Sequence, residues 1–334
     1  AQLEVRVLQH PIVNVQRDAQ GRARALARRG SDANGSDEAV IYCEIRRILV
    51  DEDRERLVES VRTALADVRA TVEDWQPMRD KMLEIAEQFP DRAMPIDEEG
   101  VLEGQAFLRW AADDHFTFLG YREYHVVERD GDELLVADED TGLGLLRGLN
   151  RAGSPRSLKT LVAAQLPQSG SMDAIILTKT NASSDVHRSG YMDYIGVLKF
   201  DKSGKPVAEE RFIGLFTSSA YMRRPQDVPL LRKKVEAVMR RSGLKPDAYS
   251  GKALRHILES LPRDDLFQCG EDELFATAMG ILDLKERARA RLFVRRDRYG
   301  RFFSCMAFIP RERFNTKIRQ RVENLLREAF HGVR

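Results

Sequence analysis

The chain has few of the features that would assign it quickly to a class of protein. It has three cysteines in 334 residues, Cys43, Cys269 and Cys305, which lie far apart and form no C-x-x-C pair. We therefore expect buried, reduced thiols in a cytoplasmic protein, not a disulfide framework. No apolar run approaches the roughly 18 residues that a membrane span needs. The N-terminus also lacks the basic-then-apolar layout of a secretion signal.

The chain has almost no excess of charge of either sign. It contains 54 Lys and Arg against 53 Asp and Glu, a formal net charge of +1. Such a balance gives no long-range field for nucleic acid or an acidic membrane, so we expect neither as a partner. A basic and aromatic stretch, "VRRDRYGRFF" at 294–303, is the best nucleic-acid candidate, but it contains Asp297. The composition, 43% hydrophobic and 32% charged, suits a globular protein of several domains.

Motifs for catalysis, cofactors and metals are also missing. The pair Gly142-x-Gly144 lacks the third glycine, the preceding strand and the following helix of a dinucleotide-binding turn. The six histidines show no metal-ligand spacing. His187, in "SSDVHRSGYMDY", has the most polar surroundings, and an independent enzyme built around it stays an alternative to a polar hairpin or interface loop. We predict no catalytic residue, no cofactor site and no metal site.

One pattern occurs twice. Val15–Arg22 and Val294–Arg301 both read V-x-R-D-x-x-G-R, which predicts two strands joined by a turn with glycine at positive φ. Around the second copy we expect a strand at 266–269, a helix at 270–284, strands at 289–296 and 301–309, and a helix capped by Asn315. This order, β-α-β-β-α, is a ferredoxin-like unit that lacks its last strand. The first copy fits the second half of the same unit, so the repeat predicts a building block.

The whole chain therefore predicts an α+β, multidomain fold. A truncated ferredoxin-like module (1–75) is followed by a helical connector (76–114) and a mostly antiparallel sheet domain (115–222) with a helical insert near 157–165. A second connector (223–263) leads to the second module (264–334). A helix that begins at Asp51 carries an apolar face at helical spacing. The residues of that face are Leu57, Val61, Leu65, Val68 and Val72.

Several long strings resemble a known family. "HPIVNVQRDAQGR", "FTFLGYREYHV", "SDVHRSGYMDYIGVLKFD" and "SGKALRHILESLPRDDLFQ" are similar to the N-terminal region of the large-subunit bacterial NAD-specific glutamate dehydrogenases. The resemblance implies ACT-like modules flanking a PAS-like β domain. It also implies that NAD binding and the oxidative deamination of glutamate belong to a C-terminal catalytic portion. This chain would then be a regulatory and oligomerisation region without catalytic residues, or alternatively a pure assembly scaffold.

The resemblance also implies a site and partners. Amino-acid effectors would lie at the expected strand-to-helix turn, at Gly270, Glu271 and Asp272. Gly270 would let a ligand carboxylate approach free N–H groups at the helix N-terminus, and Glu271 or Asp272 would pair with its ammonium group. Acidic residues in a first helical turn also favour the helix dipole without any ligand. We further expect self-association through the ACT-like modules and contact with the catalytic portion.

Overall fold

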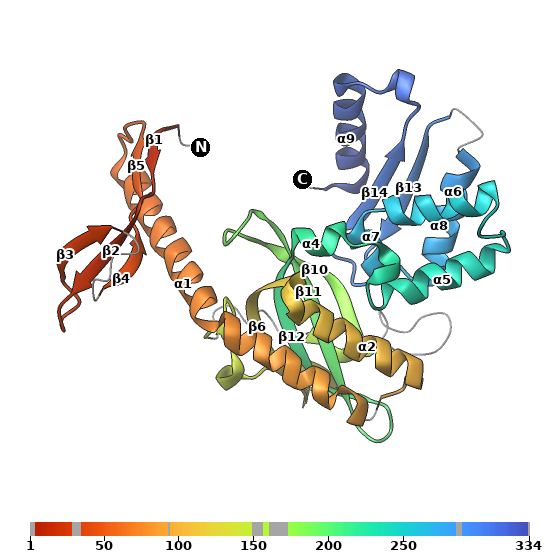
Figure 1. Cartoon of the computed structure of the whole chain (residues 1–334), viewed down its shortest axis with the longest axis horizontal. Coiled ribbons are helices and arrows are strands. Elements are labelled where there is room, and N and C mark those ends of the chain that lie inside the picture. The colour runs from red at the N-terminus through yellow and green to blue at the C-terminus, as the bar shows by residue number, and fades with distance from the viewer. Residues whose placement is uncertain are drawn as a thin grey trace. The chain divides into compact units, whose positions relative to one another are not determined.

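The computed structural model describes residues 4–28, 35–92, 94–148, 156–159, 173–284 and 289–332. The chain folds as two compact units, Ala1–Thr63 and Ala64–Arg334 (Figure 1). Both contain helices and antiparallel strands, which confirms the predicted α+β class.

The first unit consists of two small sheets and the start of a long helix. Strand β1 (Val5–Gln9) pairs with β5 (Tyr42–Ile45), and β2 (Ile12–Arg17) lies between β3 (Ala23–Arg28) and β4 (Ser36–Ala39). Helix α1 (Asp51–Gln88) begins at the predicted residue and ends in the second unit. Val15 is buried, but most other apolar side chains of this unit are exposed. The unit therefore leaves much apolar surface in contact with solvent.

Most of the apolar face predicted for α1 is exposed, although Leu57 is half-buried. Val61, Leu65, Val68 and Val72 are between 38% and 63% exposed. The buried residues of α1 lie mostly further along, and they include Thr71, Asp74, Met78, Met82, Ile85 and Ala86. The C-terminal half of α1 is thus packed within the second unit.

An antiparallel sheet forms the centre of the second unit. Its strand order is β10-β11-β12-β6-β7-β9, and β8 pairs with β6. The strands are β6 (Phe116–Arg129), β7 (Asp132–Ala137), β8 (Leu143–Gly144), β9 (Arg156–Ser157), β10 (Ile175–Ser184), β11 (Gly190–Phe200) and β12 (Pro206–Phe216). Of the helix expected near 157–165, Ser157 belongs to β9, and residues 160–165 lie outside the described residues.

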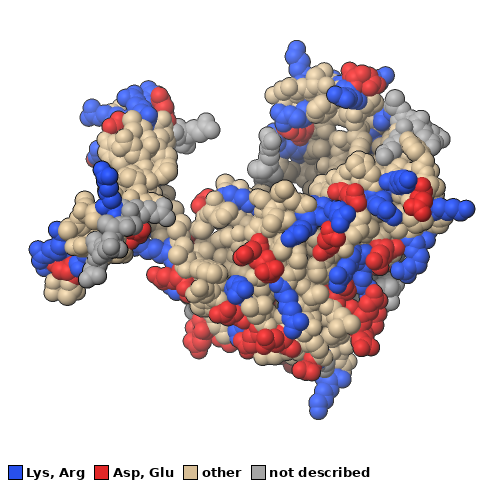
Figure 2. Space-filling view, in the orientation of Figure 1, with Lys and Arg blue, Asp and Glu red and all other residues tan. Residues whose placement is uncertain are grey.

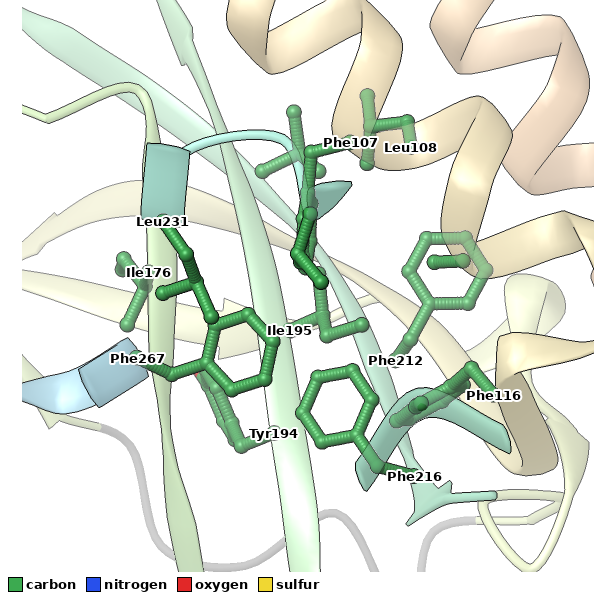
Figure 3. Packing of buried hydrophobic residues seen from close by; sticks show 14 of the residues in the cluster. Phe107, Leu108, Phe116, Ile176, Tyr194, Ile195, Phe212, Phe216, Leu231 and Phe267 are labelled. Atoms are coloured by element: carbon green, nitrogen blue, oxygen red, sulfur yellow. The ribbon is translucent and has the colours of Figure 1, made fainter. Parts of the chain in front are cut away.

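Helices cover one face of this sheet. The C-terminal half of α1 and helix α2 (Glu98–Trp110) pack on it, and Asp97 caps α2 by accepting from the Gly100 N–H at 2.7 Å. Phe107 and Leu108 of α2 join Ile195 and Phe212 of the sheet in one buried cluster (Figure 3).

Short helices follow the sheet in sequence. They are α4 (Ser218–Met222), α5 (Leu231–Ser242), α6 (Tyr249–Ser260), α7 (Arg263–Gln268) and α8 (Glu271–Leu284). Helix α5 ends at Gly243 with φ 65°, the left-handed conformation that favours glycine at a helix C-terminus. The strand expected at 266–269 was wrong, because these residues belong to α7 and its C-cap. Pro262 precedes α7, and Asp264 and Asp265 stand in its first turn, where acidic side chains favour a helix.

The chain closes with the second copy of the repeated hairpin. Strands β13 (Arg291–Arg296) and β14 (Phe303–Phe308) pair as predicted. Helix α9 (Thr316–Phe330) follows, and the Asn315 side chain caps it by accepting from the Ile318 N–H at 3.0 Å.

The two copies of V-x-R-D-x-x-G-R form the same turn. In each copy the aspartate side chain accepts hydrogen bonds from the backbone N–H groups two and four residues later. The distances are 3.0 and 2.9 Å at Asp18, and 3.1 Å for both bonds at Asp297. The glycines, Gly21 and Gly300, have φ of 76° and 67°, a region that side chains with a Cβ rarely adopt. The repeat therefore encodes a local turn, which confirms its interpretation as a structural element.

The surface shows no separation of charge on the visible face, where basic and acidic side chains are interspersed (Figure 2). No helix in the described part of the chain is long and apolar enough to cross a membrane. Cys269 is buried as expected, but Cys43 is exposed and Cys305 is half-buried. The expectation of three buried thiols was therefore wrong.

Candidate functional site

The second unit contains a cleft of about 890 Å³. Its walls come from α2, β10, the start of α5, the junction of α7 with α8, and the turn between β13 and β14. Gly270, Glu271 and Asp272, the residues predicted from the sequence, all line it. Segments separated by more than a hundred residues in sequence therefore meet around the predicted position.

Part of the lining of the cleft is hydrophobic and buried. Ile176 of β10, Leu231 of α5 and Phe267 of α7 line it and belong to the main buried cluster (Figure 3). Phe267 stacks on Phe216 of β12, with ring centroids 4.7 Å apart and planes at 13°. This packing attaches the α7–α8 junction to the sheet.

Lys234 of α5 holds the end of α7. Its Nζ donates to the carbonyls of Leu266, Phe267 and Cys269 at 3.1, 2.9 and 2.9 Å. A cation at a helix C-terminus satisfies the unpaired carbonyls and interacts favourably with the helix dipole. Burial lowers the pKa of the Lys234 ammonium. Since all three of its hydrogens are used, Lys234 positions the junction and has no donor left for a ligand.

Gly270 differs from its predicted role. Its N–H, expected to be free for a ligand, donates to Glu273 Oε2 at 3.1 Å, as in a capping box. A Cβ at this position would lie 2.7 Å from a guanidinium nitrogen of Arg298. The glycine therefore makes room for Arg298, which reaches Asp173 at 3.3 Å.

The two predicted acidic residues have different surroundings. Asp272 forms an ion pair with Arg241, whose guanidinium lies 4.3 Å from the centroid of the Phe275 ring. Glu271 is exposed and forms no hydrogen bond or ion pair with any described residue. Glu271 is thus the carboxylate of this turn that is available to a ligand.

The opposite wall contains a carboxylate that sequence reasoning missed. Glu103 of α2 accepts from the Leu230 N–H at 2.8 Å and from Arg232 Nε at 2.7 Å. Leu230 has φ 67°, a strained conformation for a residue with a large side chain. Glu103 and Arg232 are 129 residues apart, and no local pattern in the sequence signals this pair.

The Glu103 contact predicts a pH dependence. Burial raises the pKa of Glu103, but the hydrogen bonds from Arg232 and Leu230 outweigh it and hold the pKa below its usual range. A carboxyl whose pKa is lowered by folding stabilises the folded state at pH values above its pKa in the unfolded chain, about 4.3 for glutamate. This stabilisation is lost as the pH falls from there through the lower pKa of the folded state. We expect the unfolding free energy of Glu103→Gln to fall less steeply between pH 5 and 3 than that of the wild type. Urea unfolding followed by tryptophan fluorescence measures this, and equal slopes would contradict it.

The charge of the cleft favours a ligand with a positive group. Seven carboxylates and three cations line it. Lys233 pairs with Glu99 at 3.2 Å, and Arg298 pairs with Asp173. A free ammonium group would find Glu271, whereas a ligand carboxylate would need Lys233 or Arg298 to exchange partners.

The alternative centred on His187 receives no support from the geometry. His187 is exposed, in a left-handed turn between β10 and β11 with φ 66°, and its ring bonds to no described residue. Asp193, close to it in sequence, is buried and bonded to Lys179 at 2.6 Å and to the Phe216 N–H at 2.9 Å. Nor does the described part of the chain bring together three side chains that could hold a metal ion.

Three family models match parts of the chain. They are "Glutamate dehydrogenase, ACT1 domain" at residues 1–65, "Glutamate dehydrogenase, helical motif 1" at 228–287 and "Glutamate dehydrogenase, ACT2 domain" at 291–334. The chain is 37% identical, over 98% of its length, to the NAD-specific glutamate dehydrogenase of Pseudomonas aeruginosa. The chain belongs to the NAD-specific glutamate dehydrogenase family.

Two further relatives are similar over most of the chain. The NAD-specific glutamate dehydrogenase of Halomonas elongata is 36% identical over 99% of the chain, and that of Mycobacterium tuberculosis is 28% identical over 84%. The chain spans about a fifth of the length of these relatives, 20%, 21% and 16% respectively. Of the lining residues of the cleft, Leu230, Lys234 and Gly270–Glu273 fall inside the helical-motif match, and Arg298 falls inside the ACT2 match.

Proposed function

We propose that the chain is a regulatory and assembly region of an NAD-dependent glutamate dehydrogenase, and that it has no catalytic activity of its own. The parent reaction would be the oxidative deamination of L-glutamate to 2-oxoglutarate and ammonia, carried out by a separate catalytic portion that binds NAD. The family membership supports this assignment. The cytoplasmic location and the PAS-like character of the middle sheet stay predictions.

The cleft is the proposed effector site, and the observation that carries it is the position of Glu271. This carboxylate is exposed on the wall of a cleft whose other charges are mostly paired. An amino acid would place its ammonium group on Glu271 and its carboxylate near Arg298 or Lys233. Because the wall includes α8 and the β13–β14 turn, such a ligand would connect the helical motif with the second ACT-like module.

A thermal-shift screen with the common amino acids tests the site. A ligand at a hundred times its dissociation constant stabilises the folded state by about 2.7 kcal/mol, so at least one amino acid is expected to raise the melting temperature. Glu271→Gln is expected to remove the shift, and Gly270→Val is expected to weaken it by displacing Arg298. Glu139→Gln, an exposed glutamate outside the cleft, is the matched control. A shift that survives unchanged in Glu271→Gln would contradict the site.

Self-association is the second part of the proposal. In the first unit Leu8, Leu26 and Ile41 are 59%, 70% and 61% exposed, and β3 is an edge strand of its sheet. Exposed apolar side chains on an edge strand favour contact with another chain. We propose that copies associate through the ACT-like modules.

The expected result is that the chain forms dimers or larger oligomers at micromolar concentration, measured by analytical ultracentrifugation. Leu26→Lys is expected to weaken association by about tenfold or more, because it replaces the exposed apolar side chain of the proposed contact face by a charge. Ala25→Lys is the control, since adjacent strand residues point to opposite faces. A monomeric wild-type chain would refute the assembly proposal. Association without any amino-acid effect would instead favour the pure scaffold.

A further inference from the structure

Arg122 is a buried cation without a carboxylate partner among the described residues. It lies in the middle of β6 with 0% of its surface exposed. Its Nη2 donates to the carbonyl of Leu146 and, at 2.7 Å, to that of Gly148. Its Nε and Nη1 are equally buried and have no hydrogen-bond partner. A buried charge with unsatisfied donors is strongly unfavourable unless an anion pairs with it.

A second arginine lies directly opposite. Arg211 of β12 is the cross-strand neighbour of Arg122, so the two side chains lie on the same face of the sheet. Arg211 lies 3.5 Å from the centroid of the Tyr124 ring, and its charge is balanced by Glu209 at 2.9 Å. Like charges at directly opposed positions repel. Glu209 therefore neutralises Arg211 and leaves Arg122 without a counter-charge among the described residues.

This face of the sheet is distinct from the one that packs on α1 and α2. Tyr121, the residue before Arg122, contacts Phe212 in the buried cluster, with ring centroids 4.7 Å apart. Because side chains alternate along a strand, Arg122 points to the opposite face. Arg122 is also not part of the wall of the cleft. The inference therefore does not depend on the proposed effector site.

The neighbouring sequence supplies positive charge and no negative charge. From Thr141 to Met172 there is no Asp or Glu, although acidic residues make up 53 of the 334 in the chain. The same stretch contains Arg147, Arg151, Arg156 and Lys159. Arg301, in the turn after β13, adds another guanidinium 5.1 Å from the centroid of the Tyr194 ring. Arg147 and Lys159 pair with carboxylates from other segments, Asp74 at 2.6 Å and Asp132 at 2.9 Å, whereas Arg122 has no carboxylate partner among the described residues.

We propose that Arg122 and Arg211 form the base of a binding site for a small oxyanion, a carboxylate or a phosphate. Nε and Nη1 lie on different sides of the planar guanidinium, so an oxygen of such an anion would accept a single charge-assisted hydrogen bond from one of them. The anion would supply the charge that the chain does not, and would hold the two central strands and the loop of Leu146 and Gly148 together.

Titration of the 334-residue chain with sodium phosphate and with sodium succinate tests the proposal, with sodium chloride at equal ionic strength as reference. We expect a saturable rise in melting temperature, confirmed by calorimetry, with at least one of the two anions. Affinity is expected to fall at least about tenfold in Arg122→Met, since a hydrogen-bonded charge pair is lost. Arg129→Gln, at the exposed end of the same strand, is expected to bind like the wild type.

The two probes also separate the sources of the anion. Binding of phosphate alone, or of succinate alone, assigns the site to that class, and binding of both confirms the shared chemistry. Arg122→Lys keeps a positive charge but not the planar guanidinium, and provides the test if Arg122→Met does not fold. No response beyond that of chloride would overturn the proposal. An affinity in the folded Arg122 variant equal to that of the wild type would overturn it as well.

Discussion

Replacing Glu209 by glutamine is expected to lower the unfolding free energy of the second unit by about 3–5 kcal/mol. Glu209 has 0% exposure and binds Arg211 at 2.9 Å and the hydroxyl of Tyr194. The change keeps the shape of the side chain but leaves Arg211 buried without a counter-charge. Breaking a buried pair by neutralising one partner is costly, because the remaining charge stays desolvated.

The measurement is urea unfolding followed by tryptophan fluorescence. Both tryptophans, Trp75 and Trp110, belong to the second unit, so the signal reports that unit alone. Glu133→Gln, which removes a more exposed ion pair with Lys205, is the matched control and is expected to cost less than about 1 kcal/mol. A Glu209→Gln chain as stable as this control would refute the assignment of Glu209 as the essential counter-charge.

Replacing Asp297 by alanine is expected to cost about 3 kcal/mol and to release the β13–β14 hairpin from the sheet. Asp297 is 3% exposed. Its Oδ2 accepts the two N–H groups of its own turn, and its Oδ1 accepts from Thr178 Oγ1 of β10 at 3.0 Å. Arg301 adds a bond to the Lys179 carbonyl at 2.7 Å. Hydrogen bonds to a charged acceptor contribute about 1.5–3 kcal/mol each, and a buried donor that loses its acceptor adds a penalty.

The repeat provides the control for this prediction. Asp18→Ala removes the same turn bonds in the first unit, where Asp18 pairs with Arg24 of its own hairpin. Because both tryptophans belong to the second unit, the unfolding transition that they report is expected to stay unchanged. Thr178→Val removes the docking bond alone and is expected to cost about 1 kcal/mol. Hydrogen exchange of the hairpin amides reports detachment directly. An Asp297→Ala chain that retains wild-type protection in β13 and β14 would show that the hairpin docks by other contacts.

The parts of the fold that depend on local chemistry were predictable. The D-x-x-G turns, the Asn315 cap and the Gly243 end of α5 each rest on residues within a few positions of one another. The error at 266–269 arose because a short apolar run does not distinguish a strand from a buried helix. Pro262 and the two aspartates after it were the helix-start signal that the strand assignment overlooked.

The residues of the candidate site were named in advance, but the contacts that build it were not. The family resemblance pointed to Gly270, Glu271 and Asp272, which the structure places on the wall of a cleft, while effector binding there stays a prediction. The contacts that build the wall join residues far apart in sequence. Lys234 reaches carbonyls 32 to 35 positions away, and Glu103 binds Arg232 across 129 positions. Such pairs follow from the tertiary fold, which composition and periodicity do not determine.

Calorimetric titration of the 334-residue chain with amino acids and with NAD tests the central claim, that the chain is a regulatory region without a catalytic site. The account predicts saturable binding of at least one amino acid. The affinity for that amino acid is expected to be at least about tenfold weaker in Glu271→Gln, because one ion pair with the ligand is lost. It predicts no binding of NAD. Saturable NAD binding, or an amino-acid affinity that Glu271→Gln leaves unchanged, would contradict it.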